Sequence, residues 1–288
     1  MSDAQPTRSA RLRAALRDHT VVVPGAFNAL TARAIERAGF EAAYLSGGAL
    51  ANSMLGVADV GLTTLSEAAY HASRCAAVTS IPIISDADTG FGGSENAART
   101  VEEFERAGLS GLHLEDQEFP KRCGHLAGKR LVPQVEFCEK ITAAAEARRD
   151  PDFLIIARTD ARGVTSYDDA VARAHAYVAA GADMIFPEAL ENQAEFERFA
   201  HDVPTLLLAN MTEFGRTPYL SAAEFAALGY RLVIFPVTLQ RIAMKAVEGA
   251  LAELHATGTQ KSLLGRMQTR QELYDLLDYG VAVPPAAP

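Results

Sequence analysis

The chain has 288 residues, 49% of them hydrophobic and 22% charged, and its formal net charge at pH 7 is -9. A chain of this length can bury a large core, while its negative charge argues against nucleic acid or an anionic membrane as the main partner. Three cysteines do not make a disulfide framework, so we expect a reducing compartment, the cytoplasm.

The first 18 residues, MSDAQPTRSARLRAALRD, contain no apolar core of the kind found in signal peptides. No apolar run in the chain approaches the roughly 20 residues that a membrane span needs. Arginines without many acids leave a mitochondrial transit segment as an alternative reading of this segment. We favour the first helix of a cytoplasmic protein.

Short apolar runs alternate with longer helical patterns along the rest of the chain. The runs are rich in Val, Ile and Leu with little alternation, as is typical of parallel strands covered on both faces. They predict eight strands, over residues 20–25, 42–48, 81–88, 111–116, 153–160, 184–189, 204–210 and 231–236.

The segments between these runs carry helix signals. Three begin with apparent capping boxes, namely Thr64 with Glu67, Ser166 with Asp169, and Ser221 with Glu224. Several end in a glycine directly before the next strand, where a left-handed residue closes the helix. A long helix over about 239–256, a further helical stretch and a Pro-rich end, VPPAAP, follow the last strand.

Eight βα units without a linker predict one α/β domain over residues 1–288. The favoured architecture is a TIM-type (β/α)8 barrel with an N-terminal helix and a C-terminal helical extension. An open doubly wound sheet is the alternative.

Polar residues gather where the predicted strands end, which is where a barrel carries its functional loops. Asp86 and Asp88 lie two apart on one predicted strand and so should face the same side. His113 and Glu115 repeat this spacing one strand later. Converging oxygen and nitrogen ligands suit Mg2+ or Mn2+. Solvated loop acids, or acids paired with Arg158, are the alternative.

The segment FPKRCGHLAG, residues 119–128, contains the cysteine of greatest interest. Cys123 lies close to Lys121, Arg122 and His125, and such cations should lower the pKa of a thiol. Zinc is disfavoured because Cys123 and His125 have no second ligand pair at finger spacing. Cys75 and Cys138 lie inside helical patterns and are expected to be inert.

Three arginines are candidates for holding substrate carboxylates through paired hydrogen bonds, namely Arg158, Arg241 and Arg270. Each could equally be a surface salt-bridge residue.

The segments YLSGG, DADTGFG, HLEDQ, KRCGH, ARTDA, FPEA, NMTEFG and GTQKS together resemble the isocitrate lyase/phosphoenolpyruvate mutase superfamily. The likeness covers nearly the whole chain, and KRCGH with DAD and HLED is its specific part. It implies a Mg2+-dependent carbon–carbon lyase. The favoured substrate is the tricarboxylate 2-methylisocitrate, cleaved to pyruvate and succinate in the methylcitrate cycle of propionate catabolism.

The resemblance also implies roles for individual residues. Cys123 would be the general acid, with His125, Arg158 and Asn210 stabilising the anionic intermediate. Tyr44 is the candidate base for the substrate hydroxyl, and Lys121 or a metal-bound water is the alternative. The metal would be held by Asp86 and Asp88, with Glu115 and Asp59 acting through water and His113 nearby. The implied substrate contacts are Ser46, Gly47, Gly48, Cys123, Gly124, Arg158, Glu188, Asn210, Thr212, Arg241 and Arg270, the first three through backbone N–H groups.

Other members of the superfamily remain alternatives. Isocitrate lyases share the cysteine but are longer and have Trp where this chain has Gly48, and the chain contains no Trp. The space so gained would admit an extra methyl group, although one methyl is worth only about 1–3 kcal/mol of discrimination. Isocitrate and 2,3-dimethylmalate therefore remain possible substrates. Outside enzymes, a thiol sensor or a scaffold barrel would not explain the ring of acids.

Two further expectations concern assembly and motion. Family members are usually homotetramers that exchange C-terminal helices, and residues 239–280 are suited to this. Gly124 and Gly128 flank the cysteine loop, so residues 119–129 are expected to close over a bound substrate.

Overall fold

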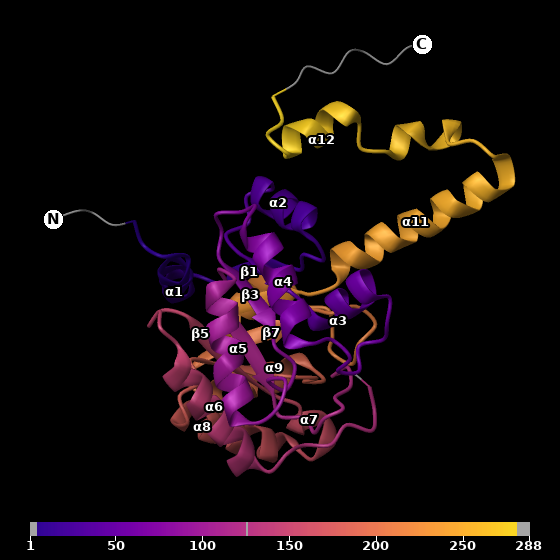
Figure 1. Ribbon diagram of the computed structural model, residues 1–288. Helices are drawn as coiled ribbons and strands as arrows, with labels where there is room; N and C mark the ends of the chain where they lie inside the picture. The colour runs from indigo at the N-terminus through magenta and orange to yellow at the C-terminus, as the bar shows by residue number, and fades with distance from the viewer. Residues whose placement is uncertain (1–4, 125, 281–288) are drawn as a thin grey trace.

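The computed structural model describes residues 5–124 and 126–280. Eight parallel strands form one ring with helices around it (Figure 1). The strands are β1 (Val21–Pro24), β2 (Ala43–Leu45), β3 (Ile83–Asp86), β4 (Gly111–Glu115), β5 (Leu154–Thr159), β6 (Met184–Pro187), β7 (Leu206–Asn210) and β8 (Leu232–Phe235). Each lies inside its predicted bounds, and the TIM-type barrel is confirmed.

The ring closes between the first two strands. β2 to β8 pair in chain order, and β8 also pairs with β1. A bridge between Gly25 and Tyr44 joins β1 to β2, together with a 2.8 Å hydrogen bond from the Ala26 N–H to the Tyr44 carbonyl. The open doubly wound sheet is therefore wrong.

The helices follow the predicted alternation with the strands. They are α1 (Arg8–Asp18), α2 (Ala29–Arg37), α3 (Gly47–Leu50), α4 (Leu65–Ala76), α5 (Ser94–Arg106), α6 (Gln134–Ala147), α7 (Ala161–Val164), α8 (Tyr167–Ala179), α9 (Gln193–Asp202), α10 (Ala222–Ala227), α11 (Thr238–Thr257) and α12 (Arg270–Leu276). A π-helical turn at Ala51–Leu55 and a 3-10 turn at Lys261–Arg266 complete the set. The predicted long helix after the last strand is α11.

The capping predictions hold in two cases out of three. The boxes of Thr64 with Glu67 and Ser221 with Glu224 are complete. Ser166 accepts from the N–H of Asp169, but the Asp169 carboxylate accepts from the Thr165 hydroxyl instead of returning the bond. The predicted left-handed glycines follow their helices, as at Gly108 with φ of 90°.

The core has an outer layer between strands and helices and an inner layer inside the ring. The inner layer holds apolar side chains such as Val23, Ile156 and Leu232. At the amino end of the ring it is completed by Leu12 and Leu16 of α1, which are 1% and 0% exposed. The amino end is therefore packed shut, and the carboxyl end is left to form the site.

The last helices form an extension beside the barrel. α11 runs away from it, and the chain then returns so that α12 lies over α2 (Figure 1). Asp278, just after α12, pairs with Arg33 at 2.7 Å and Arg37 at 2.9 Å of α2. None of the helices within residues 5–124 and 126–280 is long and apolar enough to cross a membrane. The VPPAAP end lies outside the described residues.

Candidate active site

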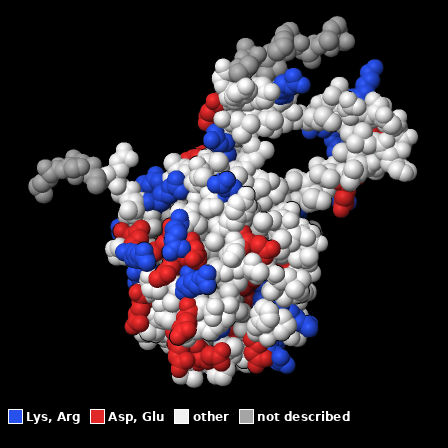
Figure 2. All heavy atoms as spheres, in the orientation of Figure 1, with Lys and Arg blue, Asp and Glu red and all other residues white. Residues whose placement is uncertain are grey.

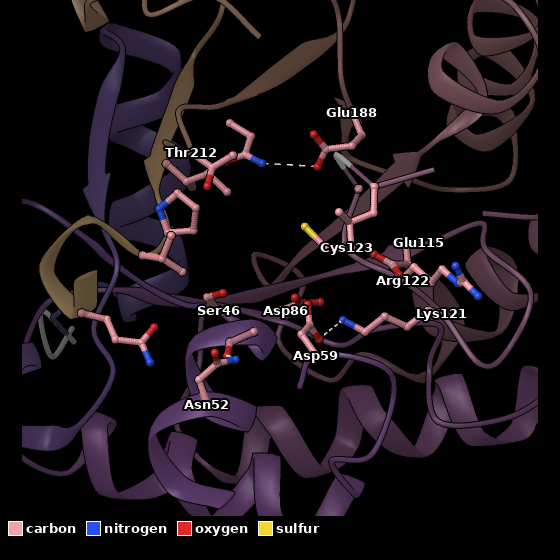
Figure 3. A pocket seen from close by; sticks show the side chains of 18 of the residues that line it. Ser46, Asn52, Asp59, Asp86, Glu115, Lys121, Arg122, Cys123, Glu188 and Thr212 are labelled. Atoms are coloured by element: carbon pink, nitrogen blue, oxygen red, sulfur yellow. Dashed lines mark hydrogen bonds and ion pairs between the residues drawn. The ribbon is translucent and has the colours of Figure 1, made fainter. Parts of the chain in front are cut away.

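The carboxyl ends of the strands surround a cavity of about 710 Å³. Figure 3 shows the Cys123 sulfur directed into it, between Glu188 and Thr212 on one side and Ser46, Asp59 and Asp86 on the other. Most of the predicted site residues line this cavity, namely Tyr44, Ser46, Gly48, Asp59, Asp86, Glu115, Lys121, Cys123, Gly124, Arg158, Glu188, Asn210, Thr212 and Arg241.

Asp86 and Asp88 lie together, although not for the predicted reason. β3 ends at Asp86, and Asp88 lies beyond it with a left-handed φ of 46°. The prediction that both are on the strand is wrong. The turn brings the Asp88 N–H within 2.9 Å of the Asp86 carboxylate. A Cβ on Gly47 would lie 2.8 Å from Asp86 Oδ2 and 3.2 Å from Asp88 Oδ1, so both carboxylates face this glycine.

The Lys121 ammonium is enclosed by acids. It forms an ion pair with Asp59 and lies 2.7 Å from Asp88 Oδ1, and its side chain is only 3% exposed. Burial alone would lower the pKa of Lys121, but Asp88, Glu115 and Asp86 raise it well above the usual value. Lys121 is therefore protonated at neutral pH, which argues against its use as a base.

The two aspartates differ in how readily they ionise. Burial raises the pKa of Asp88 to about 6, against the pull of Lys121. Burial also opposes ionisation of Asp86. Positive charge on His113 when it is protonated at low pH, together with Lys121 and Arg158, nevertheless holds the pKa of Asp86 below its usual value. Asp86 is thus a carboxylate at neutral pH.

The oxygen-rich donor set fits Mg2+ in part. Asp86 and Asp88 face the same space, and the buried Oε1 of Glu115 has no hydrogen-bond partner among the described residues. Mg2+ prefers such oxygens and usually keeps several waters. Within residues 5–124 and 126–280, no three His, Cys, Asp or Glu side chains converge closely enough to hold an ion alone. A metal on Asp86, Asp88, Glu115, Asp59 and His113 stays a prediction.

Tyr44 lines the cavity, and His113 is fully buried beside it. The Tyr44 hydroxyl and His113 Nε2 are 2.7 Å apart, and His113 Nδ1 lies 3.7 Å from Asp86 Oδ1. Burial lowers the pKa of His113 to about 4, so the imidazole is neutral at pH 7. Burial, then the charge of Asp86, raises the pKa of Tyr44 well above 10. A phenol that holds its proton this firmly is poorly suited to be the predicted base.

Arg158 is the central cation of the cavity. Its guanidinium lies 3.3 Å from Glu115 Oε2 and 3.2 Å from Glu188 Oε2, and it holds Asp160 with two hydrogen bonds. Asn210 donates to Glu188 at 3.3 Å, and its buried Oδ1 has no partner in the described part of the chain. Arg158 is therefore a buried residue of the cavity lining and not a surface salt-bridge residue.

The cysteine loop approaches this cluster through its backbone. Cys123 is exposed to the cavity, whereas Gly124 is buried. A Cβ at Gly124 would collide with Arg158 Nη2 and lie 2.5 Å from Glu188 Cγ. Any other residue at position 124 would force the Arg158 and Glu188 side chains, or the loop itself, to move. The neighbouring His125 lies outside the described residues.

Two backbone predictions for the loop after β2 need correction. Gly47 and Gly48 do not end a strand but begin α3, with Ser46 as its N-cap. The Gly47 N–H donates to Asp86 Oδ2 at 3.1 Å, so it orients the acid and is not free for a substrate carboxylate. Ser46 and Gly48 do line the cavity.

The two outer arginines have different positions. Arg241 of α11 lines the cavity, half-exposed, with Nε 3.5 Å from Glu213. Arg270 begins α12, is exposed, and does not line the cavity in this chain. The structure thus does not bring Arg270 to the other predicted substrate contacts.

Sequence reasoning missed several residues that shape the site. Lys129 and Asp160 form a buried pair behind Arg158, and Phe186, Ile234 and Pro236 give the cavity an apolar wall. Asp160 stands at a predicted strand end and so belongs to the predicted ring of acids, but no role was predicted for it. Lys129 follows no strand and belongs to no motif with a known mechanism, so no signal distinguished it. The other cysteines are as predicted, since burial raises the pKa of Cys75 to about 12.

The barrel has charged and polar residues around the cavity at its carboxyl end, which we call the mouth. This is the architecture of TIM-barrel enzymes. The family model described as phosphoenolpyruvate phosphomutase matches residues 12–255. This chain belongs to the phosphoenolpyruvate mutase/isocitrate lyase superfamily and is a carbon–carbon lyase.

Among curated relatives, a probable 2-methylisocitrate lyase of Corynebacterium glutamicum is 55% identical over 262 residues, covering 91% of this chain and 86% of the relative. The 2-methylisocitrate lyase of Escherichia coli is 44% identical over 269 residues, covering 93% and 91%.

Solved structures of related enzymes have the same fold. The crystal structure of a 2,3-dimethylmalate lyase has a TM-score of 0.90 at 38% identity, covering 96% of this chain and 93% of that one. A phosphonopyruvate hydrolase complex with oxalate and Mg2+ has a TM-score of 0.85 at 32% identity, covering 95% of each.

Proposed function

We propose that this protein is a Mg2+-dependent lyase that cleaves 2-methylisocitrate to pyruvate and succinate, within the methylcitrate cycle of propionate catabolism. The observation that carries the proposal is the position of Cys123, whose thiol faces a cavity lined by Asp86, Arg158 and Asn210. A thiol, an ionised acid group and a buried guanidinium are what a retro-aldol cleavage of a hydroxy acid requires. The names of the relatives support the same reaction.

The cleavage moves one proton from oxygen to carbon. A base takes the hydroxyl proton, the O–H electron pair forms the keto group of pyruvate, and the electrons of the broken C–C bond pass to the succinate fragment as an enolate. The Cys123 thiol gives its proton to that carbon, and the resulting thiolate is reprotonated before the next turnover. Arg158 and Asn210 stabilise the enolate by directed hydrogen bonds.

The base is better assigned to Asp59 than to Tyr44 or Lys121. Tyr44 and Lys121 both have raised pKa values and keep their protons at neutral pH. Asp59 lines the cavity, with its side chain 23% exposed and paired to Lys121. A carboxyl oxygen that faces the cavity can accept a proton from a bound substrate directly.

A bound Mg2+ would polarise the substrate hydroxyl and the nascent keto acid as a Lewis acid. Asp86 and Asp88 would hold it, with Glu115 and Asp59 reaching it through water. Mn2+ could take the same place because it favours the same ligands.

The lining of the cavity supports a methyl-bearing tricarboxylate. Phe186, Ile234 and Pro236 offer an apolar wall for a methyl group. Arg158 and Arg241 are cations on separate elements, and can each hold a different carboxylate. The second candidate, 2,3-dimethylmalate, has one carboxylate fewer and is favoured by the likeness to a lyase of that name.

We further propose that the protein is a homotetramer that pairs through the α11 extension. α11 has 20 residues and none is buried, and Ile242, Met244 and Leu251 are each more than half exposed. The extension is largely uncharged on the face shown in Figure 2. A second copy of the chain would cover this apolar surface. Analytical ultracentrifugation should give four chains, and a monomer at micromolar concentration would refute this.

A side-by-side assay tests the function. Purified protein with Mg2+ is given 2-methylisocitrate, isocitrate or 2,3-dimethylmalate, and the products are quantified. We expect 2-methylisocitrate to have the highest kcat/KM, with pyruvate and succinate in equal amounts, and EDTA to abolish turnover. Faster cleavage of 2,3-dimethylmalate would overturn the substrate assignment, and full activity in EDTA would overturn the metal assignment.

A further inference from the structure

A buried lysine lies directly behind the cysteine loop. The Lys129 side chain is 2% exposed, and its Nζ donates to the Gly124 carbonyl and, at 2.6 Å, to Asp160 Oδ1. Gly124 is the residue after Cys123, so this ammonium group holds the peptide next to the thiol. Burying an ammonium group is costly unless it is paired and hydrogen-bonded, and here both conditions are met.

Asp160 connects this lysine to the cation of the cavity. Its carboxylate accepts from Arg158 Nε at 3.0 Å and from Arg158 Nη2 at 3.1 Å, besides Lys129. Burial alone would raise the pKa of Asp160, but Arg158 and Lys129 hold it below the usual value. One ionised carboxylate therefore joins the backbone of the cysteine loop to the guanidinium that faces the cavity.

The backbone of Asp160 is itself fixed from behind. Asp116, the residue after β4, accepts from the Asp160 N–H at 2.9 Å and from the Thr159 hydroxyl at 2.8 Å. The Tyr177 hydroxyl of α8 donates to the same carboxylate at 2.8 Å. Asp116 and Asp160 are both fully buried. The chain thus provides a rigid anchor at the barrel wall for a loop that carries an exposed thiol.

We propose that Lys129 and Asp160 are positioning residues that fix the Gly124 peptide. They thereby hold the Cys123 thiol at a constant position relative to the Arg158 guanidinium. The proposal rests on the proposed function, in which Cys123 gives a proton to an intermediate stabilised by Arg158. Neither Lys129 nor Asp160 lines the cavity. They act on the reaction through the geometry of the loop and not through contact with the substrate.

Removing the Lys129 ammonium group should change the position of the Cys123 thiol while leaving substrate binding nearly unchanged. In Lys129→Met, Asp160 keeps its two bonds from Arg158, so the grip on substrate persists. The Gly124 carbonyl loses its donor, and the thiol samples positions away from the intermediate. A displacement of about 1 Å at a reacting group can cost on the order of 100-fold in rate. We therefore expect kcat to fall at least about tenfold while KM changes less than about threefold.

The experiment compares three variants of the full chain. Lys129→Met removes the donor, Lys129→Arg retains a cation, and Lys140→Met is the matched control. Lys140 is also a buried lysine, 6% exposed, but it donates to the backbone carbonyl of Thr89, at 3.2 Å, and not to that of Gly124. Lys129→Arg should recover part of the lost kcat, and Lys140→Met should resemble the unmodified protein.

A second readout needs no substrate. The alkylation rate of Cys123 by iodoacetamide, followed by mass spectrometry of its peptide, should rise in Lys129→Met and not in Lys140→Met. The proposal is overturned if a folded Lys129→Met keeps both kcat and alkylation rate, or if Lys140→Met reproduces its effects. If Lys129→Met does not fold, Lys129→Gln is measured in the same way. If the unmodified protein cleaves none of the three substrates, the proposed function fails while the alkylation test still decides the role of Lys129.

Discussion

The amino end of the barrel is filled by Leu12 and Leu16 of α1, packed against apolar strand residues, whereas the carboxyl end buries Arg158, Glu115 and Lys121 beside an exposed thiol. Burying hydrocarbon stabilises a fold without further conditions. Burying charges does so only when every charge has a partner, and often not even then. The polar end thus contributes chemistry at some expense of stability, while the apolar end provides the stability. Variants at the two ends should affect different measurements.

The largest effect is expected for Cys123→Ser at the polar end. Loss of a positioned general acid typically costs 100-fold to 10,000-fold, so succinate formation should fall by about 1,000-fold. The free energy of unfolding should change by less than about 0.5 kcal/mol because the side chain is exposed. Steady-state assays and urea denaturation check both parts. A variant with near-normal turnover would remove Cys123 from the mechanism.

Gly124→Ala should come next in size. The added methyl would meet Arg158 and Glu188, so either the loop or these two site side chains must shift, and kcat/KM should fall by about 100-fold. Gly93→Ala is the control, because a Cβ there meets nothing within 4 Å and its φ is -79°. Equal activity of the two variants would contradict the close approach described at Gly124.

At the amino end, Leu16→Ala should act on stability alone. A fully buried leucine leaves a cavity when truncated, which costs about 2–5 kcal/mol of the free energy of unfolding. Turnover per folded molecule should be unchanged, since α1 lies at the end opposite the mouth. Chemical denaturation together with an assay at low temperature measures both. A selective loss of kcat in well-folded protein would break the division between the two ends.

Arg241→Gln tests whether Arg241, at the carboxyl end of the barrel, holds a carboxylate of the substrate. If Arg241 holds the third carboxylate, kcat/KM for 2-methylisocitrate should fall about tenfold, in line with the worth of one charged hydrogen bond. The cleavage of 2,3-dimethylmalate, which lacks that carboxylate, should be unaffected. Parallel losses on both substrates would instead indicate a role common to both.

The smallest effect is expected near the amino end, where His19 pairs with Glu41 at 2.7 Å and with Asp18 at 3.3 Å. Glu41, then Asp18, raises the folded pKa of His19 above 6.5. The pairs therefore stabilise the fold fully below pH 6.5, and the contribution is lost as the pH rises through the higher folded pKa. It should stay below about 1 kcal/mol because the site is exposed. Urea denaturation of the unmodified protein and His19→Gln at pH 5.5 and pH 9 measures this contribution. The variant should lose free energy of unfolding at pH 5.5 and not at pH 9, and a loss confined to pH 9 would contradict the account.

The two ends also differed in how far the sequence predicted them. Eight apolar runs located all eight strands, because hydrophobic periodicity depends on local composition. The positions of Asp86 and Glu115 in the mouth followed from the rule that barrel sites lie at strand ends. The left-handed turn at Asp88 and the bond from Gly47 to Asp86 did not follow, because they depend on loop geometry.

Long-range pairing was the other limit. Lys129 meets Asp160, 31 residues away, and Tyr44 meets His113, 69 residues away, and no spacing rule links such positions. The raised pKa of Tyr44 depends on burial that only the folded barrel provides. The position of Arg270 depends on where α12 lies, and in this chain that is over α2, away from the cavity (Figure 1).

The most direct test of the central claim follows the proton that Cys123 is proposed to donate. In the reverse direction the thiolate must take a proton from bound succinate, so the protein in D2O with succinate, pyruvate and Mg2+ should exchange succinate C–H hydrogen for deuterium. NMR measures the rate, with Cys123→Ser and Gly93→Ala in parallel. The account predicts exchange in the unmodified protein and Gly93→Ala and at least about 100-fold less in Cys123→Ser. Equal exchange in Cys123→Ser would show that another group carries the proton.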